Sequence, residues 1–495
     1  MSYIKRAISL ALVIALCVCF VGCDNSEETK VYFGLDKDEL PTTVDPQAAS
    51  TDAELMLVRN MFEGLLRKNS KGEIVNGACS SYEKSGNTYT FTLRSGIKWS
   101  DGSKLTAEDF VYGIRRAVDP ATASPLASRL FSVKNAKSIN EGVMSVQRLG
   151  VTASGNKVII ITENESNDFL SSLTCAAAMP CKEKFFIGTD GMYGQDAENI
   201  ISNGSYRMAK WNREEFGIRL YRFEDYNGDF YAKNGGVFFS CQTEEKDNNT
   251  QLVRLNKGSI DAAFIPPEDL ADAKKQDFKI KSVENICWVM TIGNCYSREV
   301  RECLALAMTT TVYKDELPTG FRPAKSIFPA VLSVNGAENV GLTQYDIETA
   351  KMRFSKIVSD LPDKKFPSPT LYYYDVYGIK DAVTAAVANW QQNLSAFVNI
   401  HESTSLNSLQ KELSEKSLEM AVFPIYAKND SVSDYLRNFG VDGDAVTAQQ
   451  IILSDKTVIP FAFASTNLCY SEKLGKTYCD SGDGFIDFSF IIKSK

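Results

Sequence analysis

The chain has 495 residues, of which 44% are hydrophobic, and a formal net charge of −8 at pH 7. This length exceeds what one hydrophobic core usually organises, so at least two lobes are expected. The acidic balance, without a concentrated basic segment, argues against a nucleic-acid partner, because phosphate binding needs a concentrated positive surface.

The N-terminal residues have the pattern of an export signal. Lys5 and Arg6 precede an apolar run over residues 7–20, which is too short to span a bilayer comfortably. We therefore expect residues 1–22 to be a signal peptide and the protein to be extracytoplasmic. An uncleaved membrane anchor is the alternative, which the shortness of the run disfavours.

The apolar run ends in Phe20-Val21-Gly22-Cys23, which resembles a lipobox, although Phe20 stands where leucine is usual. The resemblance implies that Cys23 receives a lipid, becomes the mature N-terminus and anchors the protein to the cell membrane. Residues 23–30 are then the lipidated cysteine and a polar tether. The mature chain would carry a charge of −10, because residues 1–22 hold two positive charges and no acids.

In residues 88–125 the spacing of the hydrophobic residues changes from that of a strand to that of a helix within one continuous run. Tyr89, Phe91 and Leu93 alternate with polar residues, which predicts a half-buried strand. A turn at 100–102 follows, and Thr106 can cap a helix that Asp119-Pro120 stops.

Further elements alternate along the chain and predict a mixed α/β protein. Strands are expected at 31–35, 157–162, 217–223, 371–375 and 420–426, and a helix at about 378–394. Residues 231–251, with Gly235-Gly236 and the segment KDNNT, are expected to form a surface loop. Pro424 would confine its strand to an edge or a bulge, and Trp390 is expected in the core because it lies on the apolar stripe of its helix.

The run TLRSGIKWSDGSKLTAEDFVY (92–112) resembles the signature of the family 5 solute-binding proteins of peptide and nickel ABC importers. Further segments support the resemblance in chain order: VDPQ (44–47), LVRNMFEGLL (57–66), NGSYRMAKW (203–211), LNKGSIDAAFI (255–265), RECLALAMTTTVYKDELPTGFRPAKSIFP (301–329) and DGFIDFSF (483–490).

This resemblance implies a two-lobed periplasmic-binding-protein-like α/β fold of type II, with an extra subdomain and a hinge between the lobes. Lobe I would comprise residues 31–287 and 460–495, and lobe II residues 288–459. The implied function is to bind an oligopeptide between the lobes and deliver it to an ABC permease and its ATPase subunits. No catalysis is required, and no cofactor is expected.

In such proteins an extended peptide is held mainly through its backbone, as though it added a strand to each lobe. The lobe I segment that would pair with the ligand is Ala49-Ser50-Thr51-Asp52, and the lobe II segment is 423–430. Relatives commonly place an aspartate after the second strand, where it pairs with the ligand's α-amino group. Here Lys428 occupies that position, a two-residue shift would bring Asp430 into it, and Asp430 is equally well placed to cap a helix over 432–439.

Three aromatic side chains, Trp288, Tyr374 and Tyr426, are candidates to line the ligand pocket, with buried core as the alternative for each. Two other functions stay open. One is binding of another solute, such as a nickel chelate or an oligosaccharide. The other is a sensory or interaction role without transport, which Lys428 makes credible because it would repel an ammonium group.

Enzymatic chemistry is disfavoured. His401 is the single histidine, so it would have to serve every imidazole role in a triad, and no GxSxG, P-loop or HExxH motif is present. Cys287, Cys295 and Cys303 recur at a spacing of eight, which does not fit zinc sites, and they are expected to be mostly buried thiols.

Overall fold

The computed structural model describes residues 30–36, 40–165, 169–213, 217–241, 250–375, 377–403, 405–414, 419–427, 431–474, 479–480 and 486–494. The predicted signal peptide, Cys23 with tether residues 24–29, Lys428 and Asp430 lie outside these residues. Within the described part of the chain, no helix has the length and apolar character needed to cross a membrane.

The described helices are short to medium in length. In chain order they are α2 (Asp52–Met61), α3 (Ala107–Val118), α4 (Ala136–Asn140), α5 (Phe169–Ser172), α6 (Glu183–Gly188), α7 (Gln251–Asn256), α8 (Leu270–Lys275), α9 (Arg298–Leu306), α10 (Thr310–Tyr313), α11 (Ile347–Ser359), α12 (Lys380–Leu394), α13 (Leu406–Ser414), α14 (Val432–Arg437) and α15 (Ala445–Ser454).

The described strands are, in chain order, β1 (Lys30–Leu35), β2 (Leu66–Lys68), β3 (Ile74–Asn76), β4 (Cys79–Ser85), β5 (Thr88–Leu93), β6 (Val151–Ser154), β7 (Lys157–Ile161), β8 (Tyr206–Asn212), β9 (Gly217–Arg222), β10 (Gly236–Cys241), β11 (Ala262–Ile265), β12 (Lys279–Ile292), β13 (Arg322–Pro323), β14 (Thr370–Tyr373), β15 (Asn399–Glu402), β16 (Met420–Tyr426), β17 (Val458–Tyr470), β18 (Cys479–Asp480) and β19 (Ile486–Asp487).

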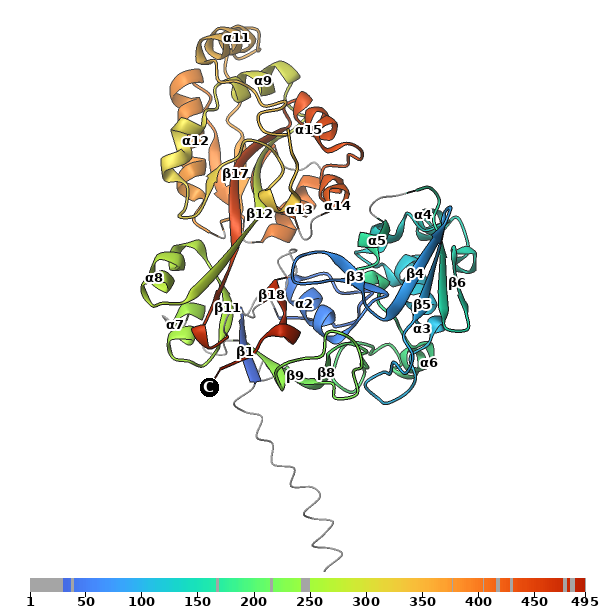
Figure 1. The fold of residues 1–495 in the computed structure, drawn as a ribbon. Coiled ribbons are helices and arrows are strands. Elements are labelled where there is room, and N and C mark those ends of the chain that lie inside the picture. The colour runs from blue at the N-terminus through green and yellow to red at the C-terminus, as the bar shows by residue number, and fades with distance from the viewer. Residues whose placement is uncertain are drawn as a thin grey trace, which may run out of the picture.

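One mixed sheet runs through both lobes in the order β15-β14-β16-β12-β17-β11-β1-β10-β9-β8, with β13 added beside β17. The long strands β12 and β17 pair antiparallel and run from the upper lobe of Figure 1 into the lower one. The two-lobed α/β fold expected from the sequence is therefore confirmed.

The buried hydrophobic residues divide between the two lobes. One cluster joins residues between Val31 and Phe239 with the C-terminal residues Phe488 and Ile491. Two further clusters lie in lobe II, one containing Trp390 on α12 and the other Leu453 on α15. Helices therefore cover the lobe II part of the sheet on both faces (Figure 1).

A separate four-stranded sheet, in the order β4-β5-β7-β6, carries the strand and helix predicted from residues 88–125. Tyr89, Phe91 and Leu93 of β5 are buried, and the helix α3 begins after Thr106, as predicted. The carboxylate of Asp109 accepts hydrogen bonds from the N–H (2.8 Å) and hydroxyl (3.1 Å) of Thr106. This unit lies beside the main part of lobe I (Figure 1).

The loop predicted for residues 231–251 is wrong for its central part. Residues 236–241 form β10, which pairs in parallel with β1 and antiparallel with β9 inside the main sheet. Val237, Phe239 and Cys241 are buried there, because every second side chain of the strand faces the core.

Several smaller expectations hold. Trp390 is fully buried and its indole N–H donates to the carbonyl of Leu304 at 2.9 Å. His401 lies exposed on β15. Cys287 and Cys303 are buried thiols as predicted, whereas Cys295 is exposed.

The crossing between the lobes contains an irregularity at Asn285. The register of β12 against β17 shifts between Glu284 and Ile286, so Asn285 has no direct partner on β17. Its side-chain oxygen instead accepts hydrogen bonds from the N–H (3.2 Å) and hydroxyl (2.9 Å) of Thr466. Its carbonyl accepts the N–H of Ala427 at 2.8 Å. One residue thus connects β17 with the end of β16.

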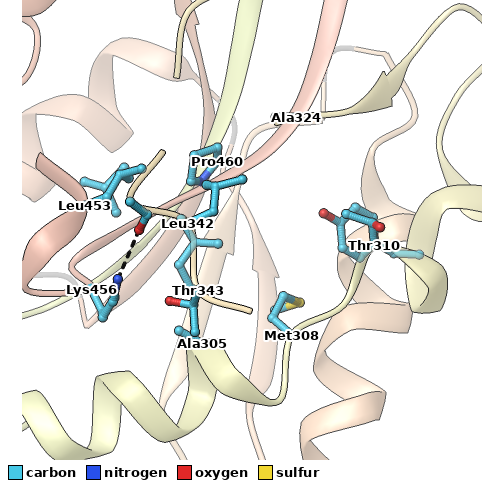
Figure 2. A pocket seen from close by; sticks show the side chains of 13 residues that line it. Ala305, Met308, Thr310, Ala324, Leu342, Thr343, Leu453, Lys456 and Pro460 are labelled. Carbon is cyan, nitrogen blue, oxygen red and sulfur yellow. Dashed lines mark hydrogen bonds between the residues drawn. The ribbon is translucent and has the colours of Figure 1, made fainter. Parts of the chain in front are cut away.

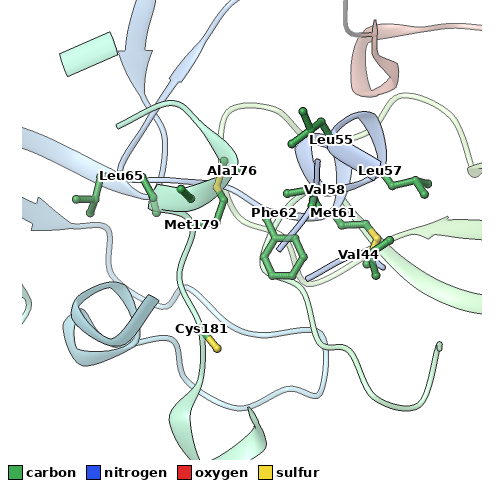
Figure 3. Packing of buried hydrophobic residues seen from close by; sticks show 14 of the residues in the cluster. Val44, Leu55, Leu57, Val58, Met61, Phe62, Leu65, Ala176, Met179 and Cys181 are labelled. Carbon is green, nitrogen blue, oxygen red and sulfur yellow. The ribbon is translucent and has the colours of Figure 1, made fainter. Parts of the chain in front are cut away.

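The helix α2 packs its buried face against the lobe I core. Leu57, Val58 and Met61 are buried, and Met61 lies near Phe62 and Val44 in Figure 3. The helix follows directly on residues 49–51, so this packing fixes where that segment emerges from the core.

Glu54 organises the loop before α2. Its carboxylate accepts hydrogen bonds from the N–H groups of Thr42 (2.9 Å), Ser50 (2.9 Å) and Thr51 (3.1 Å). Burial alone would raise the pKa of Glu54, but these backbone hydrogen bonds outweigh burial and hold the pKa below its ordinary value. The loop from 42 to 51 is therefore folded around one buried carboxylate.

Arg116 holds the same loop from the side of α3. Its guanidinium contacts the carboxylate of Asp45 (2.7 Å) and the side-chain oxygen of Gln47 (2.7 Å), and it lies 3.9 Å from the ring centre of Phe186. The extra sheet unit and the loop before α2 are thereby joined by a buried ion pair.

We predict that Asn285→Ala lowers the midpoint of urea unfolding, with a loss of about 1–3 kcal/mol, because two hydrogen bonds at the lobe crossing are removed. Asn399→Ala on the exposed edge strand β15 is the matched control and should leave the midpoint nearly unchanged. Equal midpoints for the two variants would contradict the role assigned to Asn285.

We predict that Glu54→Gln costs about 1–3 kcal/mol of stability at neutral pH, because the charged acceptor of several N–H groups is lost. The folded-state pKa of Glu54 is lowered, so its stabilisation is complete above the unfolded-state pKa and is lost as the pH falls through the folded-state pKa.

The stability difference between wild type and Glu54→Gln should therefore shrink in acid, as measured by urea unfolding over a pH series. Glu108→Gln removes an exposed acid from the first turn of α3 and serves as the control. A difference that stays constant with pH would contradict the assignment.

Candidate functional site

A cavity of about 290 Å³ lies between the lobes. Ser50 and the residues around Leu126 line it from lobe I, and Tyr426, Ala427 and the helix α14 line it from lobe II. The two segments that the resemblance assigned to ligand pairing thus each contribute residues to one cavity.

A second cavity of about 400 Å³ adjoins the first. The two cavities share one wall, which we call the charged wall, and its residues are Ser128, Arg129, Ser431, Asp434 and Arg437. Beyond this wall the second cavity extends along the hairpin of β2 and β3.

The charged wall joins the lobes. Arg129, on the 3-10 helix Ala127–Leu130, forms an ion pair with Asp434 on α14. Arg437, one turn further along α14, also pairs with Asp434 and donates a hydrogen bond to the hydroxyl of Ser128 at 3.1 Å. The side chain of Arg129 is only 7% exposed, so its ion pair is shielded from solvent more than a typical surface pair.

Residues 49–51 of the lobe I segment have used their backbone donors within the loop. The N–H of Ala49 donates to the carbonyl of Asp45 (2.9 Å), and the N–H groups of Ser50 and Thr51 donate to Glu54. Ala49 is fully buried, whereas Ser50 and Thr51 are exposed. A ligand that pairs with Ala49 and Ser50 would therefore donate to their carbonyls rather than accept from their N–H groups, while the carbonyl of Thr51 already accepts the N–H of Leu55.

On lobe II, Tyr426 ends β16 and lines the first cavity. Burial raises the pKa of Tyr426 well above its ordinary value, and the nearby Tyr377, Asp52 and Tyr374 raise it further. Asp52 belongs to lobe I, so its charge acts electrostatically on the phenol of Tyr426 across the cleft.

Pro424 lies in the part of β16 that no longer pairs with β14. It faces Trp288 of β12, but β14 pairs with β16 only along residues 420–422. The expectation that Pro424 confines its strand to an edge or a bulge is wrong for the strand as a whole, because β16 lies between β14 and β12 and its register with β12 is unbroken. Pro424 is tolerated there because its missing N–H interrupts no hydrogen bond on the β14 side, where pairing ends at residue 422.

Two of the predicted aromatic residues do not line either cavity. Trp288 is fully buried in the lobe II core, with its ring centre 6.2 Å from that of Phe321, so the buried-core alternative holds for it. Tyr374 is half-buried after β14, where its N–H donates to the carbonyl of Val422 at 3.2 Å.

The helix cap proposed for Asp430 is wrong. The hydroxyl of Ser431 caps α14 by accepting the N–H of Asp434 at 3.3 Å, and the helix covers residues 432–437 rather than 432–439. Lys428 and Asp430 themselves lie outside the described residues, so their place relative to a ligand stays a prediction.

The residues of the charged wall were not predicted from the sequence. Ser128 and Arg437 are 309 residues apart in the chain, and neither stands in a segment that carried the family resemblance. No local pattern marks such residues, because only the fold brings them together.

A smaller cavity of about 80 Å³ lies within lobe II, next to β17 and α9 (Figure 2). Lys456 reaches the carbonyl of Gly341 there at 3.2 Å, and burial lowers its pKa. None of the predicted site residues lines this cavity.

The cavities between the lobes suit binding. Their walls offer backbone carbonyls, serine hydroxyls, an aromatic phenol and charged groups, which are the means of holding a polar, extended solute. Among the described residues, no group of three or more His, Cys, Asp or Glu side chains is arranged to hold a metal ion.

Two curated proteins illustrate the similarity in sequence. The periplasmic murein peptide-binding protein MppA of Escherichia coli is 38% identical over 378 residues, which are 74% of this chain and 69% of that protein. The oligopeptide-binding protein OppA of Bacillus subtilis is 26% identical over 380 residues, which are 73% of this chain and 69% of that protein.

Solved structures agree on the fold. The crystal structure of Haemophilus influenzae OppA in complex with RPPGFSPFR superimposes with a TM-score of 0.76 at 20% sequence identity, covering 95% of this chain and 100% of that one. The sequence model of one protein family, the bacterial extracellular solute-binding proteins of family 5, matches residues 73–446, which is well over half of the chain. The chain therefore belongs to the family 5 bacterial extracellular solute-binding proteins.

Proposed function

We propose that this protein binds oligopeptides between its two lobes and delivers them to an ABC permease with its ATPase subunits. The observation that carries the proposal is the cavity of about 290 Å³ lined by Ser50 of lobe I and by Tyr426 of lobe II. Both residues belong to the segments that the family resemblance assigns to peptide pairing.

The relatives support this choice of ligand by what they bind. The similar Haemophilus influenzae structure holds the peptide RPPGFSPFR, and the similar proteins of Bacillus subtilis and Escherichia coli are named for oligopeptides and murein peptides. The family consists of binding proteins, so the proposed activity needs no catalytic step.

The proposal divides the chain at residues 287 and 460. Lobe I comprises 31–287 with 460–495, including the extra subdomain, and lobe II comprises 288–459. Two observations support this division: the hydrophobic clusters fall largely on either side of it, and β12 and β17 cross it together. Two crossing strands form the hinge about which the lobes close on a peptide.

Anchoring through Cys23 is part of the proposal. An extracellular binding protein must stay near its permease, and a lipid on the mature N-terminal cysteine achieves this. The tether over residues 23–30 leads directly to β1, which begins at Lys30 in the middle of the main sheet.

We predict that the full chain, purified from cells and denatured, releases small peptides detectable by mass spectrometry. The emptied protein should gain about 2.7 kcal/mol of stability at a peptide concentration one hundredfold above Kd, because only the folded state binds the ligand. Thermal unfolding with a peptide library measures this gain as a rise in Tm.

Tyr426→Ala should reduce that rise, because Tyr426 lines the cavity, whereas Tyr345→Ala on the exposed surface of lobe II should not. Release of a metal chelate or a sugar, with no Tm shift by any peptide, would overturn the proposal. Unchanged peptide uptake in cells lacking the protein would instead favour a sensory or interaction role.

We predict that Cys23→Ser moves the protein from the membrane fraction to the soluble fraction, because the thiol that accepts the lipid is gone. Fractionation of cells that express each form, with immunodetection, measures the change. Cys295→Ser, which removes an exposed thiol in lobe II, is the control and should remain in the membrane fraction. Membrane retention of both variants would contradict lipidation at Cys23.

A further inference from the structure

We propose that the edge of lobe I from which the tether leaves rests on the membrane and binds anionic phospholipid headgroups. We call this edge the tether face, and its residues are Tyr231, Lys233, Lys473, Ile492 and Lys493. The inference rests on the proposed lipid anchor at Cys23 and adds a second contact between the protein and the bilayer.

The first argument is the short length of chain between the lipid and the main sheet. β1 begins at Lys30, seven residues after Cys23. Even when fully extended, seven residues span at most about 25 Å. Lys30 therefore stays within about 25 Å of the bilayer surface, which keeps the surface around it within reach of the lipid headgroups.

The C-terminal segment 488–494 gathers the tether face around the start of β1. The ammonium group of Lys493 donates a hydrogen bond to the carbonyl of Lys30 at 3.1 Å. The N–H of Lys233 donates to a carbonyl of the same segment at 2.8 Å, and the carbonyl of Lys473 accepts one of its N–H groups at 2.7 Å. The backbones of both lysines are thus held against the segment that contacts the first residue of β1.

The second argument is the charge of the tether face. Lys233 and Lys473 are exposed, and neither forms an ion pair with another described residue. Neighbouring acids are paired with other cations: Glu224 with Arg222, Asp261 with Lys493, and Glu472 with Lys279. Asp229, an exposed acid of the loop that carries Lys233, offsets part of the charge. A small positive excess remains on a chain whose net charge is −8, and an anionic membrane surface attracts it.

The third argument is that apolar side chains are exposed beside these lysines. Ile492 is 47% exposed and Tyr231 is 39% exposed. The ammonium group of Lys233 lies 5.8 Å from the ring centre of Phe490. An exposed aliphatic side chain, a tyrosine with its polar tip and flexible lysines are the residue types that favour the interface between lipid and water.

The tether is a second source of negative charge for the same lysines, because it carries Asp24, Glu27 and Glu28. The experiment must therefore separate contact with lipid from contact with the tether. The tether is present in every environment in which the protein is placed, whereas anionic lipid is present only where it is added.

The test follows the acylation of individual lysines by a water-soluble reagent on the full lipid-bearing protein, with peptide mass spectrometry as the readout. The protein is placed in vesicles of equal parts phosphatidylcholine and phosphatidylglycerol, in vesicles of phosphatidylcholine alone, or in neutral detergent. We expect Lys233 and Lys473 to react about fivefold more slowly in the vesicles with phosphatidylglycerol, which is the factor expected for one lysine at an anionic surface.

Lys356 is the internal control, because it is exposed on α11 at the far end of lobe II (Figure 1) and should react equally fast in all three environments. Raising the salt concentration should remove most of the protection of Lys233 and Lys473, because it screens charges at the surface.

Variants test the two kinds of contact separately, with the protection of Lys233 as the readout. Lys473→Gln should weaken this protection, whereas Lys356→Gln should leave it unchanged. Ile492→Ser should also weaken it, and Ile451→Ser, which changes an isoleucine that is 55% exposed on α15, is the matched control. An unchanged rise in Tm with peptide shows that each variant is folded and still binds its ligand.

Fast acylation of Lys233 and Lys473 in the vesicles with phosphatidylglycerol would overturn the tether face and leave the lipid anchor standing. Equal protection in detergent would assign it to the acidic tether, and equal protection on phosphatidylcholine alone would remove the preference for anionic lipid, so either result would also overturn the inference. Failure of the protein to float with any vesicle would overturn lipid anchoring itself and this inference with it.

Discussion

The antiparallel pairing of β12 with β17 is the interaction on which the rest of the structure depends. The chain enters lobe II along β12 and returns along β17, and their register runs from Lys279 opposite Tyr470 to Thr291 opposite Val458. β12 also pairs with β16, and β17 with β11, so one ladder of hydrogen bonds connects the two lobes. The ladder has register shifts at Asn285 and between Trp288 and Val289. Such irregularities increase the local twist of the paired strands where they pass from one lobe to the other.

The crossing of β12 and β17 between the lobes also positions the end of β16, which lines the cleft from lobe II. Ile286 faces Tyr426, and the carbonyl of Asn285 holds the N–H of Ala427, so the end of β16 is fixed by the residue that interrupts the ladder. In lobe I, Glu54 fixes the opposite side of the cleft, because its carboxylate accepts hydrogen bonds from the N–H groups of Ser50 and Thr51. Hydrogen bonds within each lobe thus position the backbone segment that lines its side of the cleft. These segments hold their conformation without a ligand.

Local patterns predicted the elements with a clear period and failed where turn residues interrupted one. The strand and helix around Tyr89 and Phe110 were recognisable because their buried positions recur at two and then about four residues. β10 was overlooked because Gly235-Gly236 on one side and a polar run on the other suggest a loop, although Val237, Phe239 and Cys241 alternate like a strand. Gly236 belongs in that strand, since a Cβ there would lie 2.4 Å from the carbonyl oxygen of Leu220.

The candidate site was predictable only in part, for a different physical reason. The family resemblance assigned Ser50 and Tyr426 to the segments that pair with a ligand, and both residues line the first cavity. It did not reveal that Trp288 points into the core, since burial on one face of a central strand depends on the helices that cover it. The charged wall was beyond any local pattern, because Arg129 and Asp434 meet only after both lobes have folded and approached.

The nature of that wall has a consequence for motion. Each of the large described hydrophobic clusters stays on one side of the cleft, whereas the contacts between Arg129, Asp434, Arg437 and Ser128 that cross it are polar. Separating apolar surfaces exposes them to water at a cost proportional to their area, but separated ions and hydroxyls regain hydration. The lobes can therefore part along the cleft without opening a hydrophobic core, while the paired strands β12 and β17 keep them connected. A polar contact across the cleft combined with an unbroken sheet behind it is the arrangement that permits reversible closure.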